Sequence, residues 1–133
     1  MDFSQIAPGT RSGMLMIGGQ YAAMCVERAK EEINLVYIES EGEGNKRTET
    51  LVESLPCIAN GKIYFKIQFN NDQTCVFCFS TDGINWSKPT RKFSAKGAHW
   101  VGAKIGIFSI VDGNNEKEGY ADFSYFKVTA TDK

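Results

Sequence analysis

The stretch that decides the fold class reads Lys62-Ile63-Tyr64-Phe65-Lys66-Ile67-Gln68-Phe69. Isoleucine or phenylalanine occupies every second position, and lysine, tyrosine or glutamine occupies the positions between. This period of two is typical of a β-strand with one buried face. Turn-forming residues follow at positions 70–73, and a β-branched and aromatic run resumes at 74–80. The two runs therefore predict a β-hairpin.

The rest of the chain carries further short β-type runs, separated by turns that contain glycine. We predict strands at 13–17, 21–28, 33–39, 47–53, 91–94, 103–111 and 120–129. The segment 22–33 also contains helix-forming residues, and we assign it mostly to strand. Many short strands of this kind indicate an all-β fold, a two-sheet antiparallel β-sandwich with jelly-roll topology.

Composition and charge predict an ordinary water-soluble domain. The 133 residues suit a single domain spanning 1–133, and the 42% hydrophobic and 23% charged residues are close to the averages for globular proteins. A formal charge of -1 argues against a nucleic-acid partner, because such proteins carry an excess of Lys and Arg. No apolar run approaches the ~18 residues that a membrane-spanning helix needs, so we expect no membrane partner.

The four cysteines, at positions 25, 57, 75 and 78, raise the question of a metal or redox site. Cys75 and Cys78 form a Cys-x-x-Cys motif inside a predicted strand. Residues three apart on a strand point to opposite faces, so these two thiols do not converge on one metal ion. We predict no metal site and no cofactor. Residues 1–9 lack the pattern of a secretory signal, and with unpaired thiols this favours a cytoplasmic location.

Catalytic chemistry finds little support in the sequence. A glycosidase needs two carboxyl groups that face a sugar from opposite sides. Glu39, Glu41 and Glu43 alternate on one face toward a glycine-rich turn, which is typical of a solvated edge. The single histidine, His99, has no serine or cysteine motif beside it. We therefore predict no catalytic residue.

Aromatic side chains are the candidates for a binding site. Sugar-binding sandwiches stack aromatic rings on pyranose rings, and Tyr37, Tyr64 and Trp86 are the candidates for such a carbohydrate platform. Tyr64 shares a predicted strand face with lysines, and it could equally serve a cross-strand pair or a subunit contact. Core packing explains the other aromatic residues in predicted strands: Trp100, Phe108, Phe123 and Phe126.

The last third of the chain carries a recognisable pattern. It reads His99-Trp100-Val101-Gly102-Ala103-Lys104-Ile105-Gly106-Ile107-Phe108, and later Gly119-Tyr120-Ala121-Asp122-Phe123-Ser124-Tyr125-Phe126-Lys127-Val128. This ending resembles that of the β-xylosidase C-terminal concanavalin A-like domain, the accessory β-sandwich of glycoside hydrolase family 43 enzymes. The turn Phe-Ser-x-Asp-Gly-x-x-Trp at 79–86 is similar to that family's pattern as well.

The resemblance covers nearly the whole chain but only the later part of the family domain, whose first strands have no counterpart before Asp2. In these enzymes a five-bladed propeller hydrolyses xylosides or arabinosides, and the sandwich packs against it. The resemblance therefore implies a non-catalytic accessory module, with a glycosidase catalytic domain and a xylo- or arabino-oligosaccharide as partners. Ser124 stands where the family pattern commonly has Asp, and serine is a poorer calcium ligand than a carboxylate.

Two other functions remain open at this stage. The chain could be a protein–protein assembly module that binds no sugar, or a small glycoside hydrolase in its own right. An exposed aromatic groove with polar groups at its rim would favour sugar binding, and a broad apolar patch would favour assembly. Without the family's first strands, the sandwich should leave strand edges uncovered, so we expect a two-fold homodimer.

Overall fold

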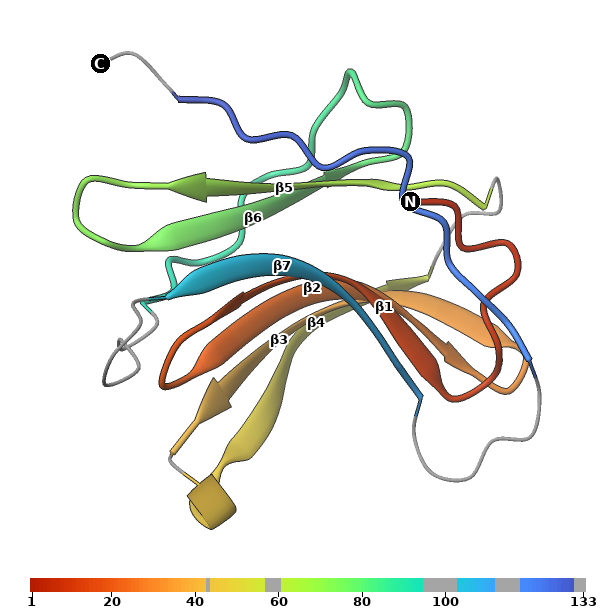
Figure 1. Cartoon of the computed structure of the whole chain (residues 1–133), viewed down its shortest axis with the longest axis horizontal. Helices are drawn as coiled ribbons and strands as arrows, with labels where there is room; N and C mark the ends of the chain where they lie inside the picture. Colours follow the sequence, from red (N-terminus) through yellow and green to blue (C-terminus); the bar gives the residue numbers. More distant parts are fainter. Residues whose placement is uncertain (43, 57–60, 95–102, 112–117, 131–133) are drawn as a thin grey trace.

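The computed structural model describes residues 1–42, 44–56, 61–94, 103–111 and 118–130 (Figure 1). Its regular elements are β1 (Thr10–Ile17), β2 (Tyr21–Ala29), β3 (Glu32–Glu41), the 3-10 turn η1 (Gly44–Lys46), β4 (Thr48–Pro56), β5 (Tyr64–Phe69), β6 (Cys75–Ser80) and β7 (Lys104–Val111). Within the described ranges, no helix is long and apolar enough to cross a membrane.

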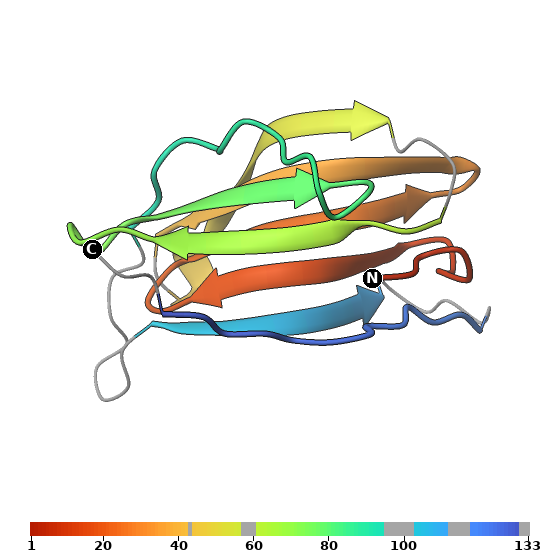
Figure 2. The same ribbon diagram turned by 90° about the horizontal axis from the view of Figure 1, so that it is seen from above.

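The strands form two sheets that face each other (Figures 1 and 2). One sheet has the order β4-β3-β2-β1-β7, and the other is the β5-β6 hairpin. Every pair of neighbours is antiparallel. The predicted all-β fold of two antiparallel sheets is therefore confirmed. The segment 22–33, which also contains helix-forming residues, is mostly strand: it holds most of β2, which pairs with β1 and β3, and the start of β3.

Isolated bridges widen the smaller sheet on both sides. Asp2 pairs with Lys62 next to β5 and with Asp122 on its other side, while Cys75 of β6 pairs with Phe93. The N-terminal segment thus lies between β5 and the 118–130 segment, as the view from above shows (Figure 2). This arrangement creates the groove that is described below.

Two predicted strands are shorter than the sequence pattern indicates. The 120–129 run forms a single bridge, at Asp122, and the 91–94 run forms a single bridge, at Phe93. The first run bonds to the N-terminal segment at two positions, Tyr120 to Gln5 and Asp122 to Asp2, and among the described residues its later part joins no backbone ladder. A strand without a neighbour has no ladder to join.

The main hydrophobic core lies between the two sheets. Its fully enclosed members include Tyr37 of β3 and Phe77 of β6, whose ring centroids are 5.3 Å apart. Met16 and Met24 contribute from β1 and β2, and Ile63 contributes from the residue before β5. This core joins the hairpin to the larger sheet.

A second cluster covers the opposite face of the larger sheet. It is built from Ala23, Cys25, Val36 and Ile38, with partly buried neighbours that include Phe108. Phe108 is thus packed, as predicted, but in this outer cluster. The core prediction is wrong for Phe126, which is 46% exposed, while Phe123 is partly buried and Trp100 lies outside the described residues.

Candidate functional site

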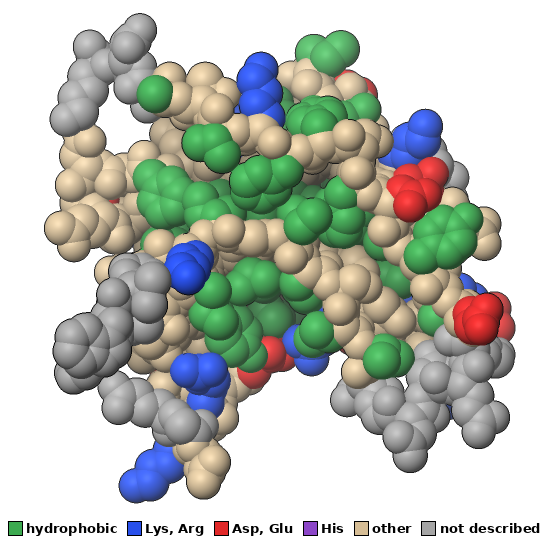
Figure 3. Space-filling model, viewed as in Figure 1, with side chains coloured by type: hydrophobic (Ala, Val, Ile, Leu, Met, Phe, Trp, Pro, Cys, Tyr) green, Lys and Arg blue, Asp and Glu red, His purple; other side chains and the backbone are tan. Residues whose placement is uncertain are grey.

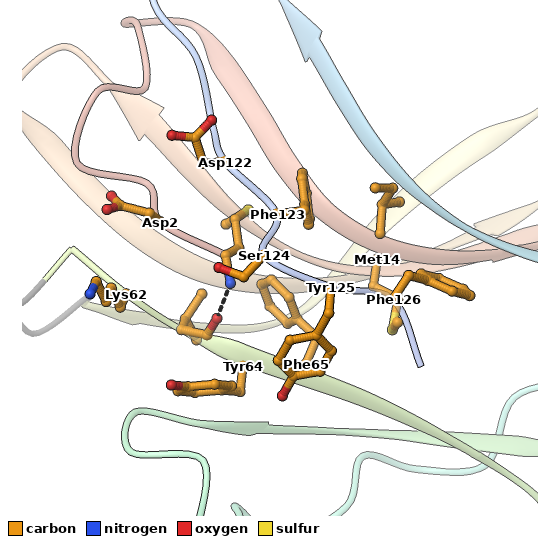
Figure 4. A pocket seen from close by; sticks show the side chains of 13 residues that line it. Asp2, Met14, Lys62, Tyr64, Phe65, Asp122, Phe123, Ser124, Tyr125 and Phe126 are labelled. Atoms are coloured by element: carbon orange, nitrogen blue, oxygen red, sulfur yellow. Dashed lines mark hydrogen bonds between the residues drawn. The ribbon is translucent and has the colours of Figure 1, made fainter. Parts of the chain in front are cut away.

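A groove with a volume of about 330 Å³ opens beside the N-terminus, between the two sheets (Figure 4). Tyr64 and Phe65 of β5 form one side, and residues 122–126 form the other. Met14 of β1 and Ile107 of β7 lie at its base, because their side chains point from the larger sheet toward the smaller one. Figure 3 shows hydrophobic side chains gathered along this opening between the sheets.

The polar groups of the groove lie at the end where the chain begins. The Asp2 carboxylate accepts hydrogen bonds from the backbone N–H of Ser4 (2.9 Å) and from its hydroxyl (2.7 Å), and these bonds lower the pKa of Asp2. The Met1 ammonium group donates to the carbonyl of Ile63 at 2.6 Å, and partial burial lowers its pKa. These groups hold the N-terminal segment in place.

Tyr37 is in the core, away from the groove. Its side chain is 1% exposed, its ring packs against Phe77, and its hydroxyl donates to Glu39 at 2.8 Å. Burial and that hydrogen bond raise the pKa of Tyr37 well above its ordinary value. A ring enclosed in this way has no face available for a sugar.

Tyr64 and Trp86 lie together on the outer face of the β5-β6 hairpin. Lys66 points to the same face as Tyr64, and its ammonium group lies 4.2 Å from the centre of the Trp86 ring. Gly83, at φ 77°, sits against the Tyr64 ring, since a Cβ placed there would be 3.3 Å from it. One face of each ring is therefore already occupied, and Tyr64 alone of the three predicted platform residues reaches the groove.

Asp82 fixes the turn that follows β6. This turn lies beside the Tyr64 ring and is followed by Trp86. The Asp82 carboxylate accepts the backbone N–H groups of Ile84 and Asn85, both at 2.8 Å, and the side-chain amide of Asn85 at 2.7 Å. These hydrogen bonds hold the pKa of Asp82 far below its usual range. The Asp-Gly motif in the sequence is thus a structural turn, with its carboxylate engaged in backbone contacts.

A polar network crosses the outer face of the larger sheet. Glu49 of β4 accepts a hydrogen bond from Arg11 of β1 at 2.7 Å and one from the Tyr21 hydroxyl at 2.6 Å. Arg11 also lies 3.6 Å from Glu27. Cys25 is buried on the same face, and this burial raises the pKa of its thiol to about 12. Both carboxylates share one guanidinium group and neither lines the groove, so the network is structural.

Glu39 corrects an expectation from the sequence. It was expected on a solvated edge, but it is 8% exposed and accepts hydrogen bonds from Tyr37 and from Arg91. Its strand position explains the burial, since Leu35 and Tyr37 are the preceding residues on the same core-facing side. The ion pair with Arg91 attaches the segment after β6 to the larger sheet.

The described cysteines are separate from one another. Cys75 lies in the main core and Cys78 is opposite Lys66 in the hairpin, so the motif points to the two faces of β6 as predicted. Burial raises the pKa of Cys75 to about 11. In the described part of the chain, no three His, Cys, Asp or Glu side chains come close enough to share a metal ion. Cys57 and His99 lie outside that part.

Comparison with known proteins decides the family. The sequence model of the β-xylosidase C-terminal concanavalin A-like domain matches residues 1–129. The chain belongs to this family. A curated relative of this concanavalin A-like domain is a β-xylosidase of Formosa agariphila, which is 27% identical over 126 residues. The match covers 94% of the present chain and 19% of that relative, and no solved structure matches.

Membership of the β-xylosidase C-terminal domain family confirms the resemblance seen in the ending of the sequence. The matched region is a small part of the relative's length, and the family is named for the C-terminal concanavalin A-like domain of β-xylosidases. The chain accordingly corresponds to the C-terminal domain of such enzymes, which is their non-catalytic part. Met14, Phe65, Ile107 and Tyr125 are among the groove residues that the sequence did not mark as part of a site.

Proposed function

We propose that this domain is an accessory module that binds polypeptide, and that it supports the catalytic part of a family 43 glycosidase through the groove and its apolar border. The observation that supports the proposal is the exposed apolar surface beside the groove. The 118–130 segment alone exposes four large side chains: Tyr120, Tyr125, Phe126 and Val128. Ile107, at the base of the groove, is 44% exposed.

Exposed apolar side chains gathered beside a groove are unusual on a protein that functions without a binding partner. Tyr125 is 67% exposed and Val128 is 83% exposed, although both belong to a segment that borders the groove. Contiguous exposed apolar surface marks a contact with another macromolecule, and aromatic residues are enriched in the centres of such contacts. A catalytic domain packed on this border would remove these side chains from water.

Sugar binding is the second candidate, and the observation that favours it is the pairing of Tyr64 and Tyr125 in the lining of the groove. A xylo- or arabino-oligosaccharide could stack on these rings. Such a ligand also needs several side chains that offer hydrogen bonds. The Asp2 carboxylate is engaged by Ser4, and Gly83 rests against the Tyr64 ring, so polypeptide contact ranks first.

The experiment mixes the purified chain with the catalytic part of the Formosa agariphila β-xylosidase, prepared as a separate polypeptide, and measures the mass by light scattering. A one-to-one complex is expected. Ile107→Lys should weaken it by about tenfold or more, since a lysine charge would enter an apolar contact. Ile110→Lys is the matched control, because Ile110 lies on the same strand, is 54% exposed and does not line the groove. Absence of a complex, with xylotetraose binding instead, would contradict the proposal.

A further inference from the structure

The edge of β5 that faces the groove has backbone groups that bond to no other described residue. Phe65 is paired directly with Phe79 of β6. The backbone of Phe79 bonds on its other side, where its N–H donates to the Ser87 hydroxyl and its carbonyl accepts the Ser87 N–H. Phe65 and Phe79 are therefore a non-hydrogen-bonded pair, and the N–H and C=O of Phe65 point away from β6 toward the groove.

The same alternation applies one step further along β5. Ile67 is paired with Phe77, whose N–H donates to the Thr90 hydroxyl and whose carbonyl accepts the Thr90 N–H. The backbone groups of Ile67 thus point in the same direction as those of Phe65. Among the described residues, none forms a backbone hydrogen bond with Phe65 or Ile67 on this side. A sheet edge in this state is a template for another strand.

The N-terminal segment shows how a strand pairs between β5 and the 118–130 segment. Met1 exchanges two hydrogen bonds with Ile63, and Asp2 exchanges two with Asp122, so this segment is paired on both sides. β5 and the residues after Asp122 continue on either side of the groove, and Figure 2 shows the N-terminus between them. A strand in the groove would therefore have the same two neighbours as the N-terminal segment.

We propose that the groove accepts an extended segment of a partner polypeptide, which adds to the smaller sheet as a strand antiparallel to β5. This inference rests on the proposed function, in which the partner is the catalytic part of a family 43 glycosidase. The segment would bond to the backbone of Phe65 and Ile67 on one side and to the chain near Ser124 on the other. It would also cover Met14 and Ile107.

The pattern of the partner segment follows from the register. Residues opposite each other on neighbouring antiparallel strands share a face, and Ile63, Phe65 and Ile67 face the core. The partner residues opposite Phe65 and Ile67 should therefore be large and apolar. The residues between them lie beside Tyr64 and Lys66 on the outer face and should be polar. An alternating apolar and polar segment is the expected ligand.

The test uses the full chain, labelled with nitrogen-15, and a short peptide of alternating valine and threonine. Amide hydrogen exchange at Phe65 and Ile67 should slow by about tenfold or more at saturating peptide, because both N–H groups gain acceptors. The control peptide has the same side chains but carries N-methyl groups at alternate residues, which removes half of its N–H donors. It should give no protection. Ile107→Lys should abolish the effect of the first peptide, whereas Ile110→Lys should preserve it.

Several results would overturn the inference. One is equal protection by the N-methylated peptide, and another is no protection at any soluble peptide concentration. Protection by xylotetraose in place of the peptide would assign the groove to a sugar. Protection that rises with protein concentration alone would assign it to a second copy of the chain. A complex with the catalytic part that forms while the peptide fails would leave the proposed function standing without strand addition.

Discussion

Replacing Phe77 by alanine should destabilise the domain more than any exposed aromatic substitution. Phe77 is 0% exposed, lies at the centre of the core between the sheets, and packs against the Tyr37 ring. Loss of a buried phenylalanine side chain, with the cavity that it leaves, costs about 3–5 kcal/mol. Since domains of this size unfold with only about 5–15 kcal/mol, the variant should remain folded but with a much smaller margin.

Urea unfolding followed by tryptophan fluorescence or circular dichroism measures this loss. With a slope of about 2 kcal/mol per molar urea, a loss near 4 kcal/mol lowers the midpoint by about 2 M. Phe69→Ala is the matched control, because Phe69 lies on the paired strand of the same hairpin and is 48% exposed, which predicts a loss of about 1 kcal/mol. Equal losses in the two variants would refute the position of the core between the sheets.

The remaining predictions concern packing, titration, activity and assembly. Gly13→Ala should destabilise by about 1–3 kcal/mol in urea unfolding, because the new Cβ would lie 2.2 Å from the Met24 carbonyl oxygen, whereas Gly106→Ala on the paired strand has no atom within 4 Å and should be nearly neutral. The free energy of unfolding should fall as pH rises from about 9 toward 12: the folded state keeps the thiol protons of Cys25 and Cys75, whose pKa values are about 12 and 11, while the unfolded chain releases them near 9. Stability that is constant or rises over this range would contradict the burial of both thiols. The isolated chain should not hydrolyse aryl xylosides or arabinosides, and turnover abolished by substituting one of its own carboxylates would contradict this. Light scattering of the chain alone should show a two-fold dimer formed through an uncovered sheet edge, such as that of β4, and a monomer mass that persists above micromolar concentration would contradict it.

The fold could be predicted from the sequence because the information is local. Alternation at 62–69 and the turn at Asp82-Gly83 each specify one element, and the structure contains both. The same local pattern at 120–129 predicted a full strand, which the structure shows only as a bridge at Asp122. A strand depends on its neighbour as well as on its own side chains, and the neighbouring segment bonds to this run only through Asp2 and Gln5 among the described residues.

The candidate site could not be predicted in full, because it depends on contacts between segments that are far apart in the sequence. Tyr37 and Tyr64 look alike as aromatic residues in strands, yet one is enclosed by the core and the other borders the groove. Only the order of strands in the sheets places β5, the N-terminal segment and residues 122–126 side by side. The burial of Glu39, in contrast, could have been predicted from the sequence. Glu39 lies two residues after Tyr37 on one strand, so both side chains point to the same core-facing side.

If this domain contacts polypeptide through the groove and its border, calorimetry should detect the contact. The same preparation is titrated with xylo- and arabino-oligosaccharides and with the catalytic part of a family 43 β-xylosidase. Saturable heat is expected with the protein, weakened by Ile107→Lys and preserved in Ile110→Lys, and none with the sugars. Saturable heat with an oligosaccharide and none with the catalytic part would contradict it.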